Sequence, residues 1–177
     1  MNFKPPFLYI DPSVANYKKL TDDFNEDIKS GKHIFLFLFM DGCGPCNQTK
    51  EGWKNINKFA KKEHLNPGKI VIAEINQKLF KDLQNVGKEP MGYPCLRYIK
   101  SGTIEEYEDS KISKKDRTAE SFADWIDSKL KGRVNNKHTK RGGKWSLKYK
   151  RSINCRRPKG FSQRAHCKSK RRTMKRK

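Results

Sequence analysis

The sequence predicts an α/β fold, a central mixed sheet of four or five strands flanked by helices, followed by a basic C-terminal tail. The first observation is a pair of segments, Ile34–Phe39 and Ile70–Ile75, that are apolar at nearly every position. Apolar runs of this length are typical of central strands covered on both faces. The second is that helical patterns alternate with these strands, as in βαβ units. The third is that residues 131–177 hold 20 of the 41 Lys and Arg and no acid.

The charge distribution also predicts the domain boundaries. Residues 1–130 carry the other 21 basic residues and all 19 acids, a net charge of about +2. We therefore distinguish an N-terminal extension (1–13), an α/β domain (14–131) and a basic tail (132–177). Because the tail has few apolar side chains to bury, we expect it to be disordered when alone.

Several classes of protein are excluded or disfavoured. The longest apolar run, Ile34–Met40, has 7 residues, whereas a membrane-spanning helix needs about 20. The first residues lack the basic segment and unbroken apolar stretch of a secretory signal. We therefore expect no membrane span and an intracellular location, in the cytoplasm or nucleus, where cysteines stay reduced.

The elements before the first central strand carry local signals. Phe7–Ile10 is a short apolar run that Pro12 cuts off, and residues 14–20 are ambiguous. A helix is predicted to begin at Thr21, whose hydroxyl can cap it, and to end at Gly31.

The elements after the first central strand follow from periodicity and turn residues. A longer helix is predicted from Cys46 to about His64, with apolar residues at helical spacing. The remaining elements are, in chain order, the strand 70–75, a short helix over 78–86, a hairpin of strands 95–99 and 103–107, and a last helix from Thr118 to Leu130.

The motif Cys43-Gly44-Pro45-Cys46 lies between a buried strand and a helix. A helix N-terminus stabilises a thiolate through its unpaired amides and its dipole. Two intervening residues bring the sulfurs within reach of a disulfide. We expect Cys43 to attack a disulfide and Cys46 to resolve the mixed disulfide that results.

Two other interpretations of the pair are a zinc half-site and an inert buried pair. Zinc normally takes four protein ligands in a structural site. The only clustered candidates lie in the tail, more than 100 residues away, and are Cys155, His166 and Cys167. We therefore expect redox chemistry, with no metal and no cofactor.

A second motif, Gly92-Tyr93-Pro94, precedes the strand 95–99. With the Cys-Gly-Pro-Cys motif it makes residues 14–130 resemble the thioredoxin family. The resemblance implies the thioredoxin fold and a cis Tyr93-Pro94 bond facing the cysteines. It also implies that Tyr93 and Pro94, with Gly44 and Pro45, hold an extended segment of a disulfide-bearing protein substrate.

The sequence departs from the family at two positions. Phe37 stands where the family usually has a buried acid that moves the proton of the resolving thiol, and Gly42 stands where it has Trp. An apolar neighbour makes Cys46 harder to ionise. Glu74 and Asp41 are candidates for the proton transfer. For each we nevertheless expect an ordinary surface or strand-edge carboxylate, because a charge rarely stays buried without a partner.

A third thiol lies beside the predicted loop. Cys95 follows Pro94 directly and could be a redox switch, but we expect a small buried strand residue, since unpaired cysteine is often buried.

The tail has the composition of a nucleic-acid-binding segment, because its cations can pair with phosphates and its aromatic residues can stack on bases. The clearest basic clusters are Arg156, Arg157 and Lys159, and Arg171 and Arg172. Nuclear import, an anionic membrane surface and a solvated tail without partner are the alternatives.

Residues 152–167 resemble a short basic, cysteine-bearing tail on proteins of large DNA viruses. The resemblance implies a viral origin and a location in the virion. Cys155 and Cys167 could form a disulfide or part of a metal site, and free thiols are expected in a reducing compartment.

Two functions follow. The first is a thiol–disulfide oxidoreductase, of open direction and with an unidentified electron donor or acceptor, which the tail localises on nucleic acid. The alternative is a redox-inactive thioredoxin scaffold whose tail binds or packages nucleic acid.

Overall fold

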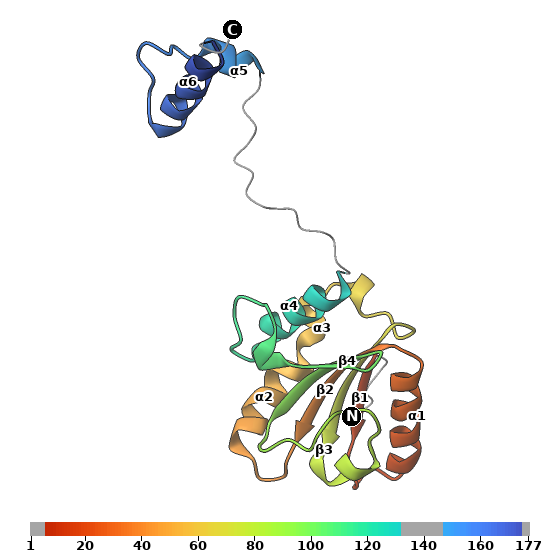
Figure 1. Cartoon of the computed structure of the whole chain (residues 1–177). Coiled ribbons are helices and arrows are strands. Elements are labelled where there is room, and N and C mark those ends of the chain that lie inside the picture. The colour runs from red at the N-terminus through yellow and green to blue at the C-terminus, as the bar shows by residue number, and fades with distance from the viewer. Residues whose placement is uncertain (1–5, 132–146, 175–177) are drawn as a thin grey trace. The chain divides into compact units, whose positions relative to one another are not determined.

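The computed structural model describes residues 6–131 and 147–174. The chain divides into two compact units, residues 1–132 and residues 133–177, which we describe separately (Figure 1).

The first unit is built on a mixed five-stranded sheet with the strand order β1-β3-β2-β4-β5. The strands are β1 (Phe7–Ile10), β2 (His33–Phe39), β3 (Ile70–Asn76), β4 (Cys95–Lys100) and β5 (Thr103–Glu106). β3 pairs in parallel with both β1 and β2, whereas β4 pairs antiparallel with β2 and with β5. This is the predicted mixed sheet.

Helices cover both faces of this sheet (Figure 1). They are α1 (Tyr17–Lys29), α2 (Gly44–Lys54), α3 (Ile56–Phe59) and α4 (Ala119–Leu130), with short 3-10 turns η1 (Lys62–His64), η2 (Gln77–Asp82) and η3 (Tyr107–Asp109).

Two hydrophobic clusters fill the space between sheet and helices. Alternate residues of β2 point to opposite faces, so Phe37 joins Trp53 and Trp125 in an aromatic cluster under α2 and α4. Leu36 packs on the other face with Phe24 of α1. β2 is therefore buried on both sides, as its apolar run predicts.

The predicted N-terminal extension, residues 1–13, is wrong at residues 7–10, which form strand β1 of the sheet. Phe7 to Ile10 pair in register with Ile72 to Ile75 and form an edge of the sheet. A run of four residues carries too little periodicity to show such pairing.

Three helix predictions also differ from the structure. α1 begins at Tyr17, and Thr21 lies inside it, where its hydroxyl donates to the Tyr17 carbonyl (2.8 Å). The helix predicted from Cys46 to about His64 is divided into α2, α3 and η1, with Asn55 ending the first piece. The helix predicted over 78–86 is the 3-10 turn η2.

One close approach fixes α2 against the start of α4. A Cβ atom on Gly52 would lie 2.3 Å from the carbonyl oxygen of Arg117, so only glycine fits there without a shift of backbone. Arg117 itself has a positive φ of 59°. A glycine at position 52 is therefore required for the close approach of α2 to the start of α4.

The second unit contains α5 (Leu147–Ser152) and α6 (Phe161–Met174). A disulfide joins Cys155 to Cys167, with the Cα atoms 5.4 Å apart. The described residues 147–174 thus form two helices and a disulfide, where we expected a tail that is disordered when alone and has free thiols. A disulfide that closes a loop removes conformations from the unfolded chain and so favours order. Residues 132–146 lie outside the described part.

None of the helices in the described ranges combines the length and the apolar character that crossing a bilayer requires.

Candidate functional site

The Cys43–Cys46 pair lies at the N-terminus of α2. Cys43 is the N-cap residue and Pro45 occupies the first turn, where a missing N–H costs nothing. Gly42 before the pair has a φ of +74°, which the turn from β2 into α2 requires. The sequence therefore produces a strand, a tight turn and a helix that begins on a cysteine.

The two sulfurs are joined in a disulfide, with Cα atoms 5.2 Å apart. Cys43 is 7% exposed and Cys46 is fully buried. The backbone N–H of Cys46 donates to the sulfur of Cys43 at 3.1 Å. This donor and the helix N-terminus stabilise negative charge on Cys43 when the bond is open.

The Tyr93-Pro94 loop lies directly against the pair. The peptide bond is cis, as the resemblance implies. The carbonyl oxygen of Tyr93 lies 3.8 Å from the sulfur of Cys43. Gly44 and Pro45 are exposed beside it, and Tyr93 and Pro94 are half-buried. The four residues predicted for substrate binding therefore all adjoin Cys43.

Glu74 is a buried carboxylate, so the expectation of an ordinary surface or strand-edge carboxylate is wrong for this residue. It lies on β3 in register with Phe37 of β2 and is 2% exposed. Since Ile70 and Ile72 of the same strand face the cluster that contains Cys46, Glu74 lies on that face as well.

Lys50 is the ion-pair partner of Glu74. Its Nζ lies 3.5 Å from Oε1 of Glu74 and 3.7 Å from the ring centroid of Phe39. Lys50 follows Cys46 by one helical turn, so both project from the same side of α2. Burial is the main reason that the pKa of Glu74 is raised, and Lys50 and Lys54 oppose this rise. Oε2 of Glu74 is buried and has no hydrogen-bond partner among the residues that the structure describes.

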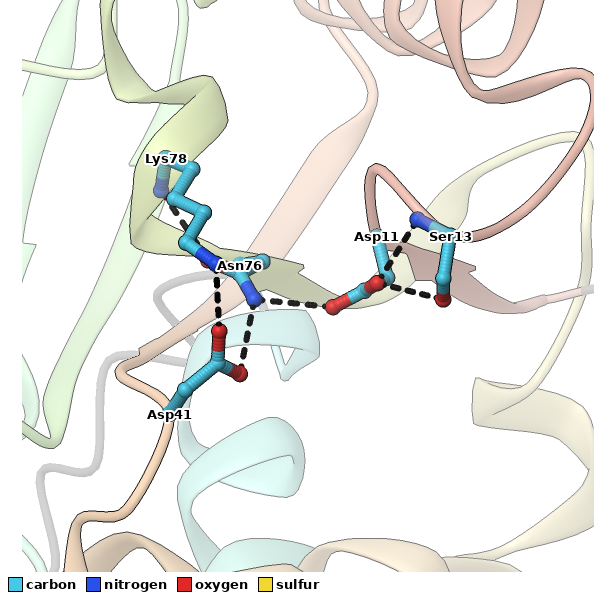
Figure 2. Close-up of polar contacts among 5 residues, drawn as sticks. All are labelled: Asp11, Ser13, Asp41, Asn76 and Lys78. Carbon is cyan, nitrogen blue, oxygen red and sulfur yellow. Dashed lines mark hydrogen bonds and ion pairs between the residues drawn. The ribbon is translucent and has the colours of Figure 1, made fainter.

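Asp41 has different surroundings (Figure 2). It is exposed, and both of its carboxylate oxygens accept hydrogen bonds, from Lys78 Nζ (2.8 Å) and Asn76 Nδ2 (3.0 Å). The bond from Lys78, followed by that from Asn76, keeps the pKa of Asp41 below its usual range. Asp41 is therefore ionised and fully engaged at neutral pH.

Asn76, which no motif in the sequence singles out, organises this end of the sheet. Its buried amide nitrogen also donates to Asp11 (2.8 Å), and its oxygen accepts from the backbone N–H of Lys78 (3.0 Å) (Figure 2). Asn76 thereby connects the ends of β1, β2 and β3 just before the turn that carries Cys43. A polar residue that ends an apolar strand is the only signal in the sequence.

Cys95 is buried and takes part in no disulfide. Burial raises the pKa of its thiol. This agrees with the expected small buried strand residue. Phe37 lies in the same cluster as Cys46, in ring contact with Trp53 (centroids 5.6 Å apart).

The predicted tail residues fall into two groups. Arg156, Arg157 and Lys159 are exposed in the connection between α5 and α6. Arg171 and Arg172 lie in α6, in the part where only the backbone is described.

A mixed five-stranded sheet between helices, with a Cys-X-X-Cys pair at a helix N-terminus, defines the thioredoxin fold. Human ERp44 in its zinc-bound form has a similar structure, with a TM-score of 0.50 and 17% identity, over 68% of this chain and 31% of that one. The J-Trx1 fragment of ERdj5 aligns with a TM-score of 0.49 and 19% identity, over 72% of this chain and 53% of the fragment.

The first thioredoxin domain of mouse protein disulfide-isomerase A4 aligns with a TM-score of 0.41 and 20% identity, over 60% of this chain and 69% of that domain. At these identities the likeness shows the fold alone. The chain spans about a third of ERp44 and about half of the ERdj5 fragment. No family model matches the sequence, and no curated protein matches it either.

Proposed function

We propose that the protein is a thiol–disulfide oxidoreductase that acts on disulfide-bearing proteins. The observation that carries the proposal is the Cys43–Cys46 disulfide at the N-terminus of α2, with the Tyr93 carbonyl 3.8 Å from the sulfur of Cys43. A thiolate on Cys43 would therefore lie next to the backbone that binds an extended substrate segment.

The exchange proceeds in two steps. In the reduced protein, the thiolate of Cys43 attacks one sulfur of a substrate disulfide, forms a mixed disulfide and releases the other substrate sulfur as a thiolate. The thiolate of Cys46 then attacks the sulfur of Cys43. This forms the Cys43–Cys46 disulfide and releases the reduced substrate, so two electrons pass to the substrate.

The reverse sequence oxidises a substrate dithiol. Its direction depends on the reduction potential of the pair and on a dithiol or disulfide partner that regenerates it.

Substrate binding follows from the positions around Cys43. The backbone of Tyr93 offers its polar groups to an extended segment, and Pro94 shapes the edge of the groove. Gly44 and Pro45 have no bulky polar side chains and leave room for that segment. In this arrangement the substrate sulfur approaches Cys43 while Cys46 stays covered.

We propose that Glu74, and not Asp41, accepts the proton of the Cys46 thiol. Cys46 is fully buried and must lose a proton before it can attack, and water reaches it poorly. Glu74 shares its face of the sheet and has one oxygen without a partner in the described part of the chain, whereas both oxygens of Asp41 accept hydrogen bonds. Lys50 balances the charge that Glu74 carries before it accepts the proton.

The test is the reduction of insulin by dithiothreitol, catalysed by the wild-type protein and by matched variants. Cys43→Ser should abolish catalysis, and Cys46→Ser should accumulate a mixed disulfide with substrate that denaturing gels without reductant detect. Cys95→Ser, which changes a thiol outside the pair, should retain activity. Equal activity of wild type and Cys43→Ser would eliminate the proposal.

A second candidate function rests on the tail. Six cations with described side chains are exposed in the second unit, namely Arg151, Arg156, Arg157, Lys159, Arg164 and Lys168. Phe37 and Gly42 stand at the two positions where the sequence departs from the thioredoxin family, and they favour a scaffold with weak catalysis. We propose that the tail binds nucleic acid in either case, and the resemblance of residues 152–167 to tails of DNA-virus proteins supports a location with a viral genome.

Salt-dependent binding of the full chain to DNA or RNA tests this second function. Truncation after Leu130 should abolish that binding, and unchanged affinity would contradict it.

A further inference from the structure

The outward face of α6 carries one aromatic and two basic side chains in a row. Phe161, Arg164 and Lys168 are separated by three and four residues, a spacing that places side chains on one side of a helix. Phe161 is 87% exposed, and Arg164 and Lys168 are exposed as well. We call these three residues the α6 face.

An adjoining side of α6 holds the unit together. Cys167 is 5% exposed and is bonded to Cys155. Gln163 donates to the hydroxyl of Tyr149 (3.0 Å) and accepts from the backbone N–H of Lys159 (2.7 Å). These contacts fix which side of the helix points outward.

No carboxylate side chain of this unit can neutralise the α6 face, because residues 131–177 contain neither Asp nor Glu. Like charges at Arg164 and Lys168 also repel one another within the helix. A polyanion removes this repulsion when its phosphates pair with the two cations and release their counterions.

We propose that the α6 face binds single-stranded nucleic acid, with an unpaired base stacked on Phe161 and the adjoining phosphates paired with Arg164 and Lys168. The proposal rests on the nucleic-acid binding proposed above for the tail and assigns it to particular residues. An exposed aromatic ring can stack on any unpaired base, whereas the bases of a duplex already stack on one another.

An anionic membrane fits the face less well. Amphipathic helices that bind membranes bury a broad apolar face. The α6 face has only one large apolar side chain, and cations follow it.

The experiment uses the oxidised full-length protein and fluorescence anisotropy with a labelled oligo(dT) and a duplex of equal length. Phe161→Ala should weaken oligo(dT) binding by about tenfold, the effect of one lost base stack, and change duplex binding by less than about twofold. Arg164→Gln should lower the salt slope by about one.

Two controls accompany these variants. Phe59→Ala removes another exposed phenylalanine, which is 50% exposed in the first unit, and should leave both affinities unchanged. Mass spectrometry after alkylation of free thiols should show that Phe161→Ala retains the Cys155–Cys167 disulfide, so that a lost affinity is not a lost fold.

The possible results separate the two proposals. If Phe161→Ala weakens single-strand and duplex binding equally, or neither, the α6 face is not the site, although the tail still binds nucleic acid. If the wild-type chain binds neither oligonucleotide, both proposals fail. Binding to phosphatidylserine vesicles in the absence of oligonucleotide binding would overturn them in favour of a membrane surface.

Discussion

The two disulfides of this chain stand in opposite relations to the structure around them. Cys43 and Cys46 lie in a unit with two hydrophobic clusters, and their bond spans two residues. Cys155 and Cys167 lie in a unit where Cys167 itself is the only buried apolar side chain among those described.

These surroundings determine which disulfide can open without loss of structure. Units this small rarely fold without a disulfide or a metal. In the first unit the fold holds the cysteines, so the bond can break and form during exchange without loss of structure. In the second unit the bond holds the fold, so breaking it should release α5 and α6.

Removing each disulfide separately tests whether its unit needs the bond in order to stay folded. Cys155→Ser with Cys167→Ser should shift the second unit toward the unfolded form by about a hundredfold, because a disulfide that closes a loop of this size contributes about 3 kcal/mol. Amide hydrogen exchange, followed by mass spectrometry, should show loss of protection in residues 147–174.

The matched control is Cys43→Ser with Cys46→Ser. It should leave hydrogen exchange in β2, β3 and α4 nearly unchanged. The claim that only the second unit depends on its disulfide is contradicted by either of two results. Both double variants could lose protection to the same extent, or the second unit could keep its protection without its disulfide.

The next largest effect on stability should come from a change in packing in the first unit. Gly52→Ala should lower the free energy of unfolding by about 1–3 kcal/mol, because the new methyl group would lie 2.3 Å from the backbone oxygen of Arg117. Urea unfolding followed by tryptophan fluorescence measures the change. Gly44→Ala, whose Cβ meets nothing within 4 Å, should leave stability unchanged, and an equal loss in both variants would contradict this account of the close approach.

A smaller effect should follow at the polar end of the sheet. Asn76→Ala leaves Asp11 and Asp41 without a shared donor (Figure 2) and should cost about 1–2 kcal/mol. Lys78→Met removes only an exposed ion pair and should lower stability much less. Thermal unfolding of both variants tests this, and similar melting temperatures would show that Asn76 does not organise the site.

The smallest effect on stability concerns Glu74. Its pKa is raised above the ordinary 4.5 by burial, so the folded protein binds a proton more tightly than the unfolded chain. Stability should therefore decline as the pH rises from about 4.5 through the raised pKa. Glu74→Gln should lack this decline, and parallel urea midpoints over that pH range would contradict the assignment.

The same variant has a kinetic consequence. Glu74→Gln should slow the second step of exchange by about tenfold or more, because Cys46 loses its proton acceptor, whereas Asp41→Asn should not. Quenched-flow measurement of mixed-disulfide decay separates the two.

The sequence was most informative where a signal is local. Two apolar runs predicted β2 and β3, and these signals depend on neighbours along the chain. That Tyr93 and Pro94 lie beside Cys43, 50 residues away, was implied only by the resemblance to the thioredoxin family.

The remaining features depend on contacts between distant residues. The pairing of β1 with β3, the burial of Glu74 between Phe37 and Lys50, and the Asn76 hydrogen bonds each join elements that no pattern connects. The Cys155–Cys167 bond was one of the alternatives considered, but free thiols were expected because cysteine state was inferred from the expected compartment.

The proposed exchange depends above all on a reactive thiolate at Cys43, at the N-terminus of α2. The most direct test is the rate at which iodoacetamide modifies each cysteine of the fully reduced protein at neutral pH, resolved by peptide mapping. The account predicts that Cys43 reacts first, faster than a free cysteine in an unstructured peptide, and that buried Cys46 and Cys95 react much more slowly. Modification of Cys43 at or below the rate of the free cysteine would contradict it.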